Sequence, residues 1–450
     1  MTCIAHIHKN TGRHLFPVHL YKKIKTVVLK IKTMKKIVFI LLIIVFSGKI
    51  ISAQTLKLDA IIDSITTLHP VVKMYNNEIR SMDEAAKGAK SWMPPEVSTG
   101  LWMVPYNTKL WRKGDMGETG MGQYMIGGQQ MIPNKKKLNA DAAYMQAMSS
   151  VEKEKKKATI NELTNDAKQY YYEWIVLQKK ITILGQNEKM LDFMIKNAEI
   201  RYRNGLGKIS AYYKAKAALG SVKNMQLMFE NDIKEKRIRI NSLMGRNAMI
   251  DFEIDTVYRL NDYSSFTFDS TLFYNSRSDL KAIDQSINIT YLKQETERQS
   301  LKPQFGIRYE HMFGFGGLPM QYSLMGMMKL PLANWSSKMN KANIESLKWK
   351  AAGLQSQKEM MVNEYSGMAY GMRNEIELKK KQLKLYEDEI IPALKNNYKT
   401  MQLSYEQNTE ELFMLYDAWE TLYMTQMEYT ELLNKVLGYQ VALDRLMEKK

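Results

Sequence analysis

The sequence is poor in cysteine, proline and glycine, and each shortage argues against a class of fold. Its 450 residues include one cysteine, ten prolines and 24 glycines. Because the single cysteine is Cys3, no disulfide and no thiol chemistry is expected downstream of it. So few prolines and glycines disfavour disorder and sandwiches with many turns. The aliphatic, charged and methionine residues that dominate instead favour helix.

The sequence also lacks a recognisable catalytic site. Beyond residue 53 it contains two histidines, His69 and His311. It has neither a glycine-rich phosphate loop nor the elbow that carries a nucleophilic serine. His69 precedes a proline, where the start of a helix explains it better than metal ligation does. We therefore expect no enzyme, no cofactor and no firm metal site.

Positive charge is concentrated at the N-terminus. Residues 1–53 carry ten lysines and arginines and no acid, and without them the formal net charge falls from +18 to +8. The remaining charge is spread over stretches of mixed sign, which argues against nucleic-acid binding. Residues 34–54, MKKIVFILLIIVFSGKIISAQ, combine a basic start, an apolar run and small residues at the end. This pattern is typical of a secretory signal peptide.

We expect cleavage after Ala53 and a true start at Met34, with an unusually long leader as the alternative. The apolar run is shorter than the ~20 residues that a membrane span requires. Export of a chain without disulfides fits the periplasm or outer membrane of a Gram-negative cell.

Beyond the leader, the sequence repeats itself at a spacing of about two hundred residues. Four pairs of segments match in the same order: 95–102 with 303–310, 123–133 with 321–331, 201–219 with 404–422, and 241–245 with 444–448. This order indicates an internal duplication. We place the first repeat at 54–250 and the second at 251–450, after a leader at 1–53.

Each repeat contains two segments in which apolar and polar residues alternate, at 95–106 and 121–132 and again at 303–313 and 321–330. Strands of this length and pattern form membrane β-barrel walls, although a soluble sheet with one buried face has the same period. The export signal and the aromatic residues near the strand ends favour the barrel. Because single-chain barrels begin at about eight strands and lipid tolerates no open edge, we expect the chain to pool its four strands with copies of itself; three copies would give twelve.

One face of these strands is predicted to line water. The residues expected to face the lumen are Gln123, Met125, Gln129, Met131, Met325, Met327 and Lys329. The chain holds 33 methionines. Thioether sulfur is a soft ligand suited to Cu(I) and Ag(I), so a conduit for metal ions is one interpretation. Methionine as a flexible filler of helices and strands is the other.

Long helices account for the rest of each repeat. No proline occurs between Pro133 and Gly205, a stretch that would form a helix of ~105 Å. A helix of this length cannot bury itself in a globule, so it must pack along shorter helices. We expect further helices at 58–91 and 272–300, and a kink at Pro392 in the second long helix.

Taken together, these features resemble the TolC family of outer-membrane efflux proteins over residues 56–447. The most specific match is RYRNGLGKIS at 201–210, which is similar to the hairpin tip of that family. The resemblance implies an α+β membrane protein: a homotrimer whose shared barrel continues into a coiled-coil tunnel of α-helices through the periplasm. It implies passive, gated export, with a periplasmic adaptor and an inner-membrane pump as partners.

The resemblance also implies adaptor contacts at both tips, near 203–208 and 406–411. These residues are Arg201, Gly205, Leu206, Ser210, Asn408 and Thr409. The second tip lacks the glycine of the first, but asparagine tolerates the left-handed conformation that a turn requires.

At the periplasmic gate the resemblance is incomplete. Asp417 matches an acidic position of the family, whereas Met414 and Glu410 replace a second acid and a basic residue. The gate bonds of the family therefore do not transfer to this chain. The alternative cargo is a drug or a peptide, and the alternative class of protein is a periplasmic coiled-coil adaptor or scaffold.

Overall fold

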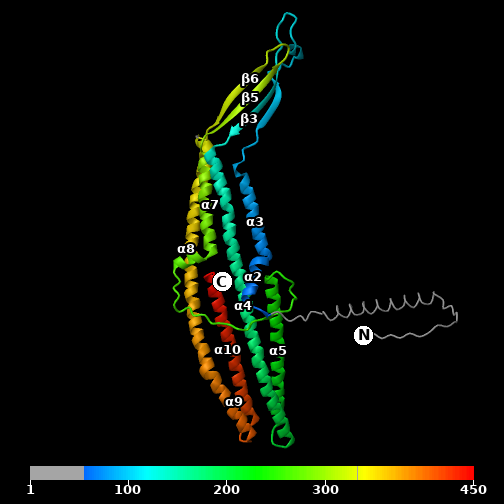
Figure 1. The fold of residues 1–450 in the computed structure, drawn as a ribbon, viewed down its shortest axis with the longest axis vertical. Helices are drawn as coiled ribbons and strands as arrows, with labels where there is room; N and C mark the ends of the chain where they lie inside the picture. The colour runs from blue at the N-terminus through cyan, green and yellow to red at the C-terminus, as the bar shows by residue number, and fades with distance from the viewer. Residues whose placement is uncertain (1–54, 332, 450) are drawn as a thin grey trace, which may run out of the picture. The chain divides into compact units, whose positions relative to one another are not determined.

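The computed structural model describes residues 55–331 and 333–449, which belong to one compact unit, Thr55–Lys450. The predicted leader, residues 1–53, lies outside the described residues. Long helices make up most of the unit, and two pairs of strands extend from them (Figure 1). In the part of the chain that the structure describes, no helix combines the length and apolar character needed to cross a membrane.

The longest element is helix α4, which runs from Lys135 to Arg203 over 69 residues. Asn134 caps its start, because the side-chain oxygen of Asn134 accepts a hydrogen bond from the backbone N–H of Lys136 at 2.9 Å. Several shorter helices pack along α4, namely α3 (Pro70–Lys87), α5 (Ile209–Leu243), α7 (Ser278–Ser300) and α10 (Leu412–Leu446). The expectation of one long helix covered by shorter ones is confirmed.

The first helix of each half is interrupted once, so the continuous helices expected at 58–91 and 272–300 are wrong. Helix α2 (Leu58–Leu68) meets α3 at His69, and α6 (Ser270–Ser276) meets α7 at Arg277. His69 has ψ 133° because a residue before proline is pushed out of the helical region. Its Nδ1 accepts a hydrogen bond from the N–H of Val71 at 3.2 Å and so restarts the helix.

The second long helix continues through a π-helical turn. Helix α8 (Asn334–Leu385), the π-helical turn η3 (Tyr386–Ile390) and helix α9 (Ile391–Glu406) follow one another directly. The turn ends at Ile390, two residues before Pro392, where the kink was predicted. Proline removes one helical hydrogen bond and its ring clashes with the preceding turn, which explains the local change of helix type.

Four antiparallel strands form one sheet in the order β2–β3–β5–β6. They are β2 (Glu96–Trp102), β3 (Gln123–Ile132), β5 (Gln304–Gly314) and β6 (Gln321–Lys329). The two halves of the chain join where β3 pairs with β5, for example Ile126 with His311. Strand β2 ends at Trp102 and not at 106 as predicted, because Met103 has φ 50° and leaves the extended conformation. A second sheet pairs β1 (Thr55–Leu56) with β4 (Glu253–Ile254) in parallel.

The loops at the far end of the sheet are fixed to each other. The ring of Trp111, from the loop between β2 and β3, stacks on Phe315 at 5.5 Å. The N–H of Gly120 donates to the carbonyl of Gly316 at 2.9 Å. A β-carbon at Gly120 would lie 2.5 Å from the carbonyl oxygen of Trp111, so the backbones approach too closely for a larger residue.

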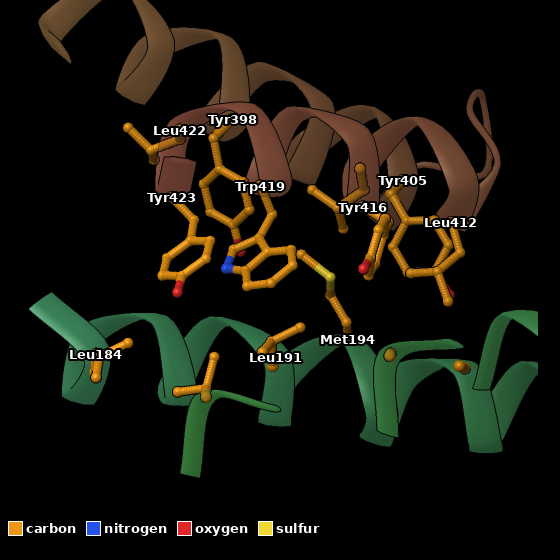
Figure 2. Close-up of a cluster of buried hydrophobic side chains, with 14 residues drawn as sticks. Leu184, Leu191, Met194, Tyr398, Tyr405, Leu412, Tyr416, Trp419, Leu422 and Tyr423 are labelled. Carbon is orange, nitrogen blue, oxygen red and sulfur yellow. The ribbon is translucent and has the colours of Figure 1, made fainter. Parts of the chain in front are cut away.

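A cluster of buried side chains joins the hairpin α4–α5 to the hairpin α9–α10 (Figure 2). Aromatic residues of the second hairpin, including Tyr398, Trp419 and Tyr423, face Leu191 and Met194 of α4. Trp419 stacks on Tyr423 with ring centroids 5.4 Å apart. Burial of each large apolar side chain contributes about 1.5–3 kcal/mol. The cluster therefore holds the two hairpins side by side, with both tips at the same end.

Candidate channel wall and hairpin tips

All seven residues predicted to face the lumen lie on one face of the sheet. The ladder pairs Gln129 with Arg308 and Arg308 with Met325, and it pairs Met131 with Gly306 and Gly306 with Met327. Paired residues point to the same side, and the other predicted residues follow by alternation: Gln123, Met125 and Lys329. Whether this face lines a lumen stays a prediction.

This polar face is connected by hydrogen bonds and one ion pair. Gln129 bonds to Glu96, and Gln123 Nε2 donates to Gln321 Oε1 at 3.2 Å. Arg308 Nε lies 2.7 Å from Glu310 Oε1, and Glu310 is buried. The two bonds between strands stabilise the sheet and fix its register, whereas Arg308 and Glu310 lie two residues apart on β5.

The opposite face is apolar and exposed. Its most exposed side chains include Val97 at 77%, Tyr322 at 73% and Leu324 at 67%. Buried Gln123 and Glu310 lie on the polar face, so here polar side chains are better covered than apolar ones. A soluble sheet with one buried face would show the reverse. A large exposed apolar surface needs an apolar partner, such as lipid or another chain.

Both hairpin tips use the same helix-ending motif. In the first, Gly205 has φ 73°, and the N–H of Leu206 donates to the carbonyl of Arg201 at 2.8 Å. In the second, Asn408 has φ 63°, and the N–H of Thr409 donates to the carbonyl of Ser404 at 2.9 Å. This is the Schellman motif, which satisfies carbonyls at a helix end. Asn408 therefore takes the left-handed conformation expected of it.

A groove of about 980 Å³ lies between the two tips. All six residues predicted at the tips line it: Arg201, Gly205, Leu206, Ser210, Asn408 and Thr409. The guanidinium of Arg201 lies 4.1 Å from the ring centroid of Tyr405, so the first tip contacts the second through a cation–π interaction. The structure brings these residues together, while their contact with an adaptor stays a prediction.

The groove also contains residues that the sequence analysis missed. Lys214 Nζ lies 4.4 Å from the ring centroid of Phe413 and 4.1 Å from that of Tyr416. Burial, assisted by Glu420, raises the pKa of the Tyr416 phenol. Lys214 follows Ser210 by one helical turn, which places it on the tip side of α5. Helical spacing alone gives no signal that aromatic rings of the other hairpin would meet it.

The two predicted gate residues share one exposed face of α10. Met414 is 44% exposed, and Asp417, one turn further along, is also exposed. The opposite face of the same turns carries Leu415 and Trp419, which are buried in the cluster of Figure 2. Nothing within the described residues closes over Met414 and Asp417, so their role as a gate stays a prediction.

A buried ion pair fixes the break between α6 and α7. Arg277 Nε and Nη2 lie 2.9 and 2.5 Å from the two carboxylate oxygens of Asp279, and Nη1 donates to the carbonyl of Leu446 at 3.0 Å. Tyr365 donates to Asp279 at 2.7 Å. Burial would raise the pKa of Asp279, but the hydrogen bonds from Arg277 and Tyr365 lower it. Glu448 accepts from the Ser278 N–H at 2.7 Å and so caps α7.

Comparison with known proteins agrees with this architecture. Residues 62–246 match the sequence model of the family described as outer membrane efflux protein. A search of curated protein sequences gives no significant match.

Solved structures of outer-membrane channels share the fold. The outer-membrane channel OprN superposes with a TM-score of 0.71 at 12% identity, over 87% of this chain and 90% of its own. CusC, whose structures are described in terms of conformational changes during folding and transmembrane channel formation, superposes with a TM-score of 0.70 at 11% identity, over 87% of this chain and 91% of its own. The outer membrane protein VceC from Vibrio cholerae superposes with a TM-score of 0.68 at 14% identity, over 87% of this chain and 95% of its own.

The family match favours a channel over the alternative of a periplasmic adaptor or scaffold, and proteins of this family are channels and not enzymes. The sequence match covers the first half of the chain, and the shared fold extends beyond the matched residues into the second half. Residues 62–246 therefore belong to the outer membrane efflux protein family, and 87% of the chain shares the fold of a solved outer-membrane channel.

Proposed function

We propose that three copies of this chain close into one twelve-stranded outer-membrane barrel, which continues as a coiled-coil tunnel of α-helices through the periplasm. The assembly is the exit duct of a tripartite efflux pump. Transport through it is passive and gated, while an inner-membrane pump selects and energises the cargo. Within each copy, residues 54–250 and 251–450 are the two halves of an internal duplication. The leader, residues 1–53, is removed by cleavage after Ala53.

The observation that carries this proposal is the incomplete sheet. Within the described residues, β2 and β6 each pair on one side only, so the sheet has two open edges. Its apolar face is exposed and suits lipid. Each backbone group left unpaired in a bilayer costs several kcal/mol, which makes an open edge untenable there. Pairing β2 of one copy with β6 of the next removes both edges.

The helices supply a second support for assembly. Exposed apolar residues recur along α8 at multiples of about 3.5 residues, which places them on one face of the helix. They are Trp335, Met339, Trp349, Met360, Leu378 and Leu385. Such a stripe is the contact surface of a coiled coil, and neighbouring copies in a tunnel would cover it.

The groove between the tips supports an adaptor as the periplasmic partner. It presents Leu206, 68% exposed, beside the charged residues Arg201 and Glu410. An exposed apolar residue surrounded by polar groups is typical of a protein contact. Asp417 and Met414 lie on the exposed face of α10 next to this groove, which suits a gate that opens when the tips separate.

Neighbouring residues on opposite faces of β6 allow a direct test. Leu324 is on the exposed apolar face and Ser323 on the polar face. We expect L324R to cost about 2–4 kcal/mol near the bilayer centre and to reduce assembly, and S323R to be tolerated. The readouts are heat-sensitive oligomers in detergent and ion conductance in planar bilayers. A monomer without conductance, or equal effects of the two substitutions, would refute the proposal.

One observation favours a soft metal ion as cargo over a drug or peptide. A β-carbon at Gly306 would lie 2.6 Å from Met131 Sδ and 3.1 Å from Met327 Cε. Both thioether side chains therefore lie over the glycine, on the face proposed to line the lumen. Thioether sulfur is a ligand for Cu(I) and, by the same softness, Ag(I).

A matched pair of variants separates this metal site from methionine as filler. We expect M131L/M327L to weaken Ag(I) binding to the purified protein and to lower silver tolerance of the cell. The control M228L/M249L changes two exposed methionines away from the sheet and from the α8 stripe, and is expected to alter neither. Equal silver binding in both variants, with loss of drug tolerance in a deletion strain, would assign the duct to drug or peptide export.

A further inference from the structure

Methionine is distributed unevenly between the two faces of the four-stranded sheet. The four strands contain six methionines. Five lie on the polar face and only Met328 lies on the apolar one; the five are Met125, Met131, Met312, Met325 and Met327. A methionine that merely fills apolar space belongs on the apolar face, among aliphatic and aromatic side chains. On the polar face the chemistry of the thioether explains the choice better than burial does.

The register of the sheet places two of these methionines side by side near the loop end. Met125 of β3 is the direct partner of Met312 on the adjacent strand β5 (Figure 1). The Cβ atoms of such partners lie about 4.5–5.5 Å apart, so two flexible thioether side chains can bring both sulfurs to one ion. Both side chains are partly exposed. The other partner of Met125 is Gly100, and nothing lies within 4 Å of a β-carbon built there, so the pair is open to an ion from the side of β2.

A hydrogen bond between two glutamine side chains lies next to this pair. Gln123 Nε2 of β3 donates to Gln321 Oε1 of β6 at 3.2 Å, across the intervening strand β5. Gln123 is the partner of Gly314, whose missing side chain leaves room for the bond. Gln321 is the partner of Met312, so the bonded amides border the methionine pair. Ordered neighbours reduce the freedom that the two thioethers lose when they bind an ion.

The charged groups beside the pair compensate each other. Glu310, two residues from Met312 on the same face of β5, is 6% exposed and forms an ion pair with Arg308 at 2.7 Å. A hard cation such as Ca²⁺ needs several oxygen ligands, and a carboxylate already paired with arginine is poorly placed to supply them. Uncharged thioethers suit soft monovalent cations instead. The surroundings therefore favour Cu(I) or Ag(I) over hard ions.

We propose that Met125 and Met312 form a second thioether site for a soft monovalent cation, Ag(I) or Cu(I), separate from the pair Met131 and Met327. Six residues separate Met125 from Met131 on β3, which corresponds to about 20 Å along the strand, so one ion cannot bind both pairs. The inference deepens the proposed function, because it adds a second site for the same cargo to the same wall. Binding is measured without transport, so the two can fail separately.

The test is Ag(I) binding to the full-length protein purified in detergent, measured as silver bound per chain after equilibrium dialysis. M125L/M312L should bind about one silver ion fewer per chain than the unmodified protein, because leucine keeps the side-chain volume and lacks the sulfur. M125L and M312L alone should each lose as much as the double variant, because one ion needs both sulfurs. The controls M328L, on the apolar face of β6, and M228L/M249L, away from the sheet, should bind silver as the unmodified protein does.

Unchanged silver binding in M125L/M312L would overturn the inference. Losses in M125L and M312L that add up to the loss in the double variant would overturn it too, since each sulfur would then bind silver independently. The variant M131L/M327L separates this inference from the proposed function. A loss in M125L/M312L without one in M131L/M327L supports the second site and rejects the first, and the reverse result rejects the second site alone. If the double variant does not assemble into heat-sensitive oligomers, the two single variants decide.

Discussion

Replacement of Arg277 by methionine tests how much the buried ion pair stabilises the junction between the halves. Arg277 is 5% exposed, and its guanidinium stacks on Tyr365 at 3.8 Å besides binding Asp279. Removing one partner of a buried pair costs about 3–5 kcal/mol, because the other charge stays buried without compensation. The side chain of Asp279 is 25% exposed, so we expect the lower end, about 3 kcal/mol.

A loss of about 3 kcal/mol corresponds to roughly a hundredfold faster hydrogen exchange in a locally opening segment. We expect this acceleration at residues 278–284 and 443–449 in R277M, measured by mass spectrometry at neutral pH. The double variant R277M/D279N should recover part of the protection, since no uncompensated carboxylate remains. If R277M/D279N loses more protection from hydrogen exchange than R277M does, or if R277M exchanges as slowly as the unmodified protein, the ion pair is not what stabilises the junction.

The same pair gives the junction a dependence on acid. Because the folded pKa of Asp279 is lowered below its usual value, the associated stability is complete above the unfolded pKa of about 4. It is lost as the pH falls through the lowered folded pKa. The protection of residues 278–284 should therefore decline in that acidic range in the unmodified protein, and this decline should be absent in D279N.

Three further predictions concern single positions. G306A forces the side chains of Met131 and Met327 aside and should lower the stability of the purified protein by about 1–3 kcal/mol, measured by thermal denaturation. G326A is the control, since nothing lies within 4 Å of the added carbon, and it should change stability little; equal losses in the two variants would contradict the packing. N408V places a β-branched residue at φ 63° and should destabilise the second tip by about 1–3 kcal/mol. The measurement is hydrogen exchange of residues 404–412, which should become faster; unchanged exchange would exclude strain at this position. Burial, followed by the nearby charge of Asp255, raises the pKa of Tyr171 to about 12. Ultraviolet titration should therefore show this phenol ionising well above pH 10, and the stability that its burial contributes should be lost between about pH 10 and 12. Ionisation near pH 10 in the folded protein would contradict its burial.

The parts of the fold that the sequence predicted are those that local pattern determines. The absence of proline after Pro133 predicts a helix, and α4 follows it as far as Arg203. Alternation predicts the strands because the period of two is imposed by the pleat. Gly205 and Asn408 mark the tips because few other residues accept a positive φ.

The parts that the sequence did not predict depend on contacts between distant segments. The break at Arg277 arises from bonds to Asp279 and to the carbonyl of Leu446, and no helix-breaking residue announces it. Lys214 meets aromatic rings only because the cluster of Figure 2 brings the second hairpin alongside the first. The end of β2 at Trp102 reflects the conformation of the next residue, which alternation cannot reveal.

The two open edges of the sheet have a consequence for genetics. If each ring contains three copies, as proposed, a copy whose β2 edge cannot pair leaves the whole ring open, even when its neighbours are normal. With equal amounts of normal and defective chain mixing at random, only about one ring in eight would consist of normal copies alone. A substitution confined to the edge of β2 should therefore be dominant, whereas a substitution that prevents the chain from folding at all should be recessive.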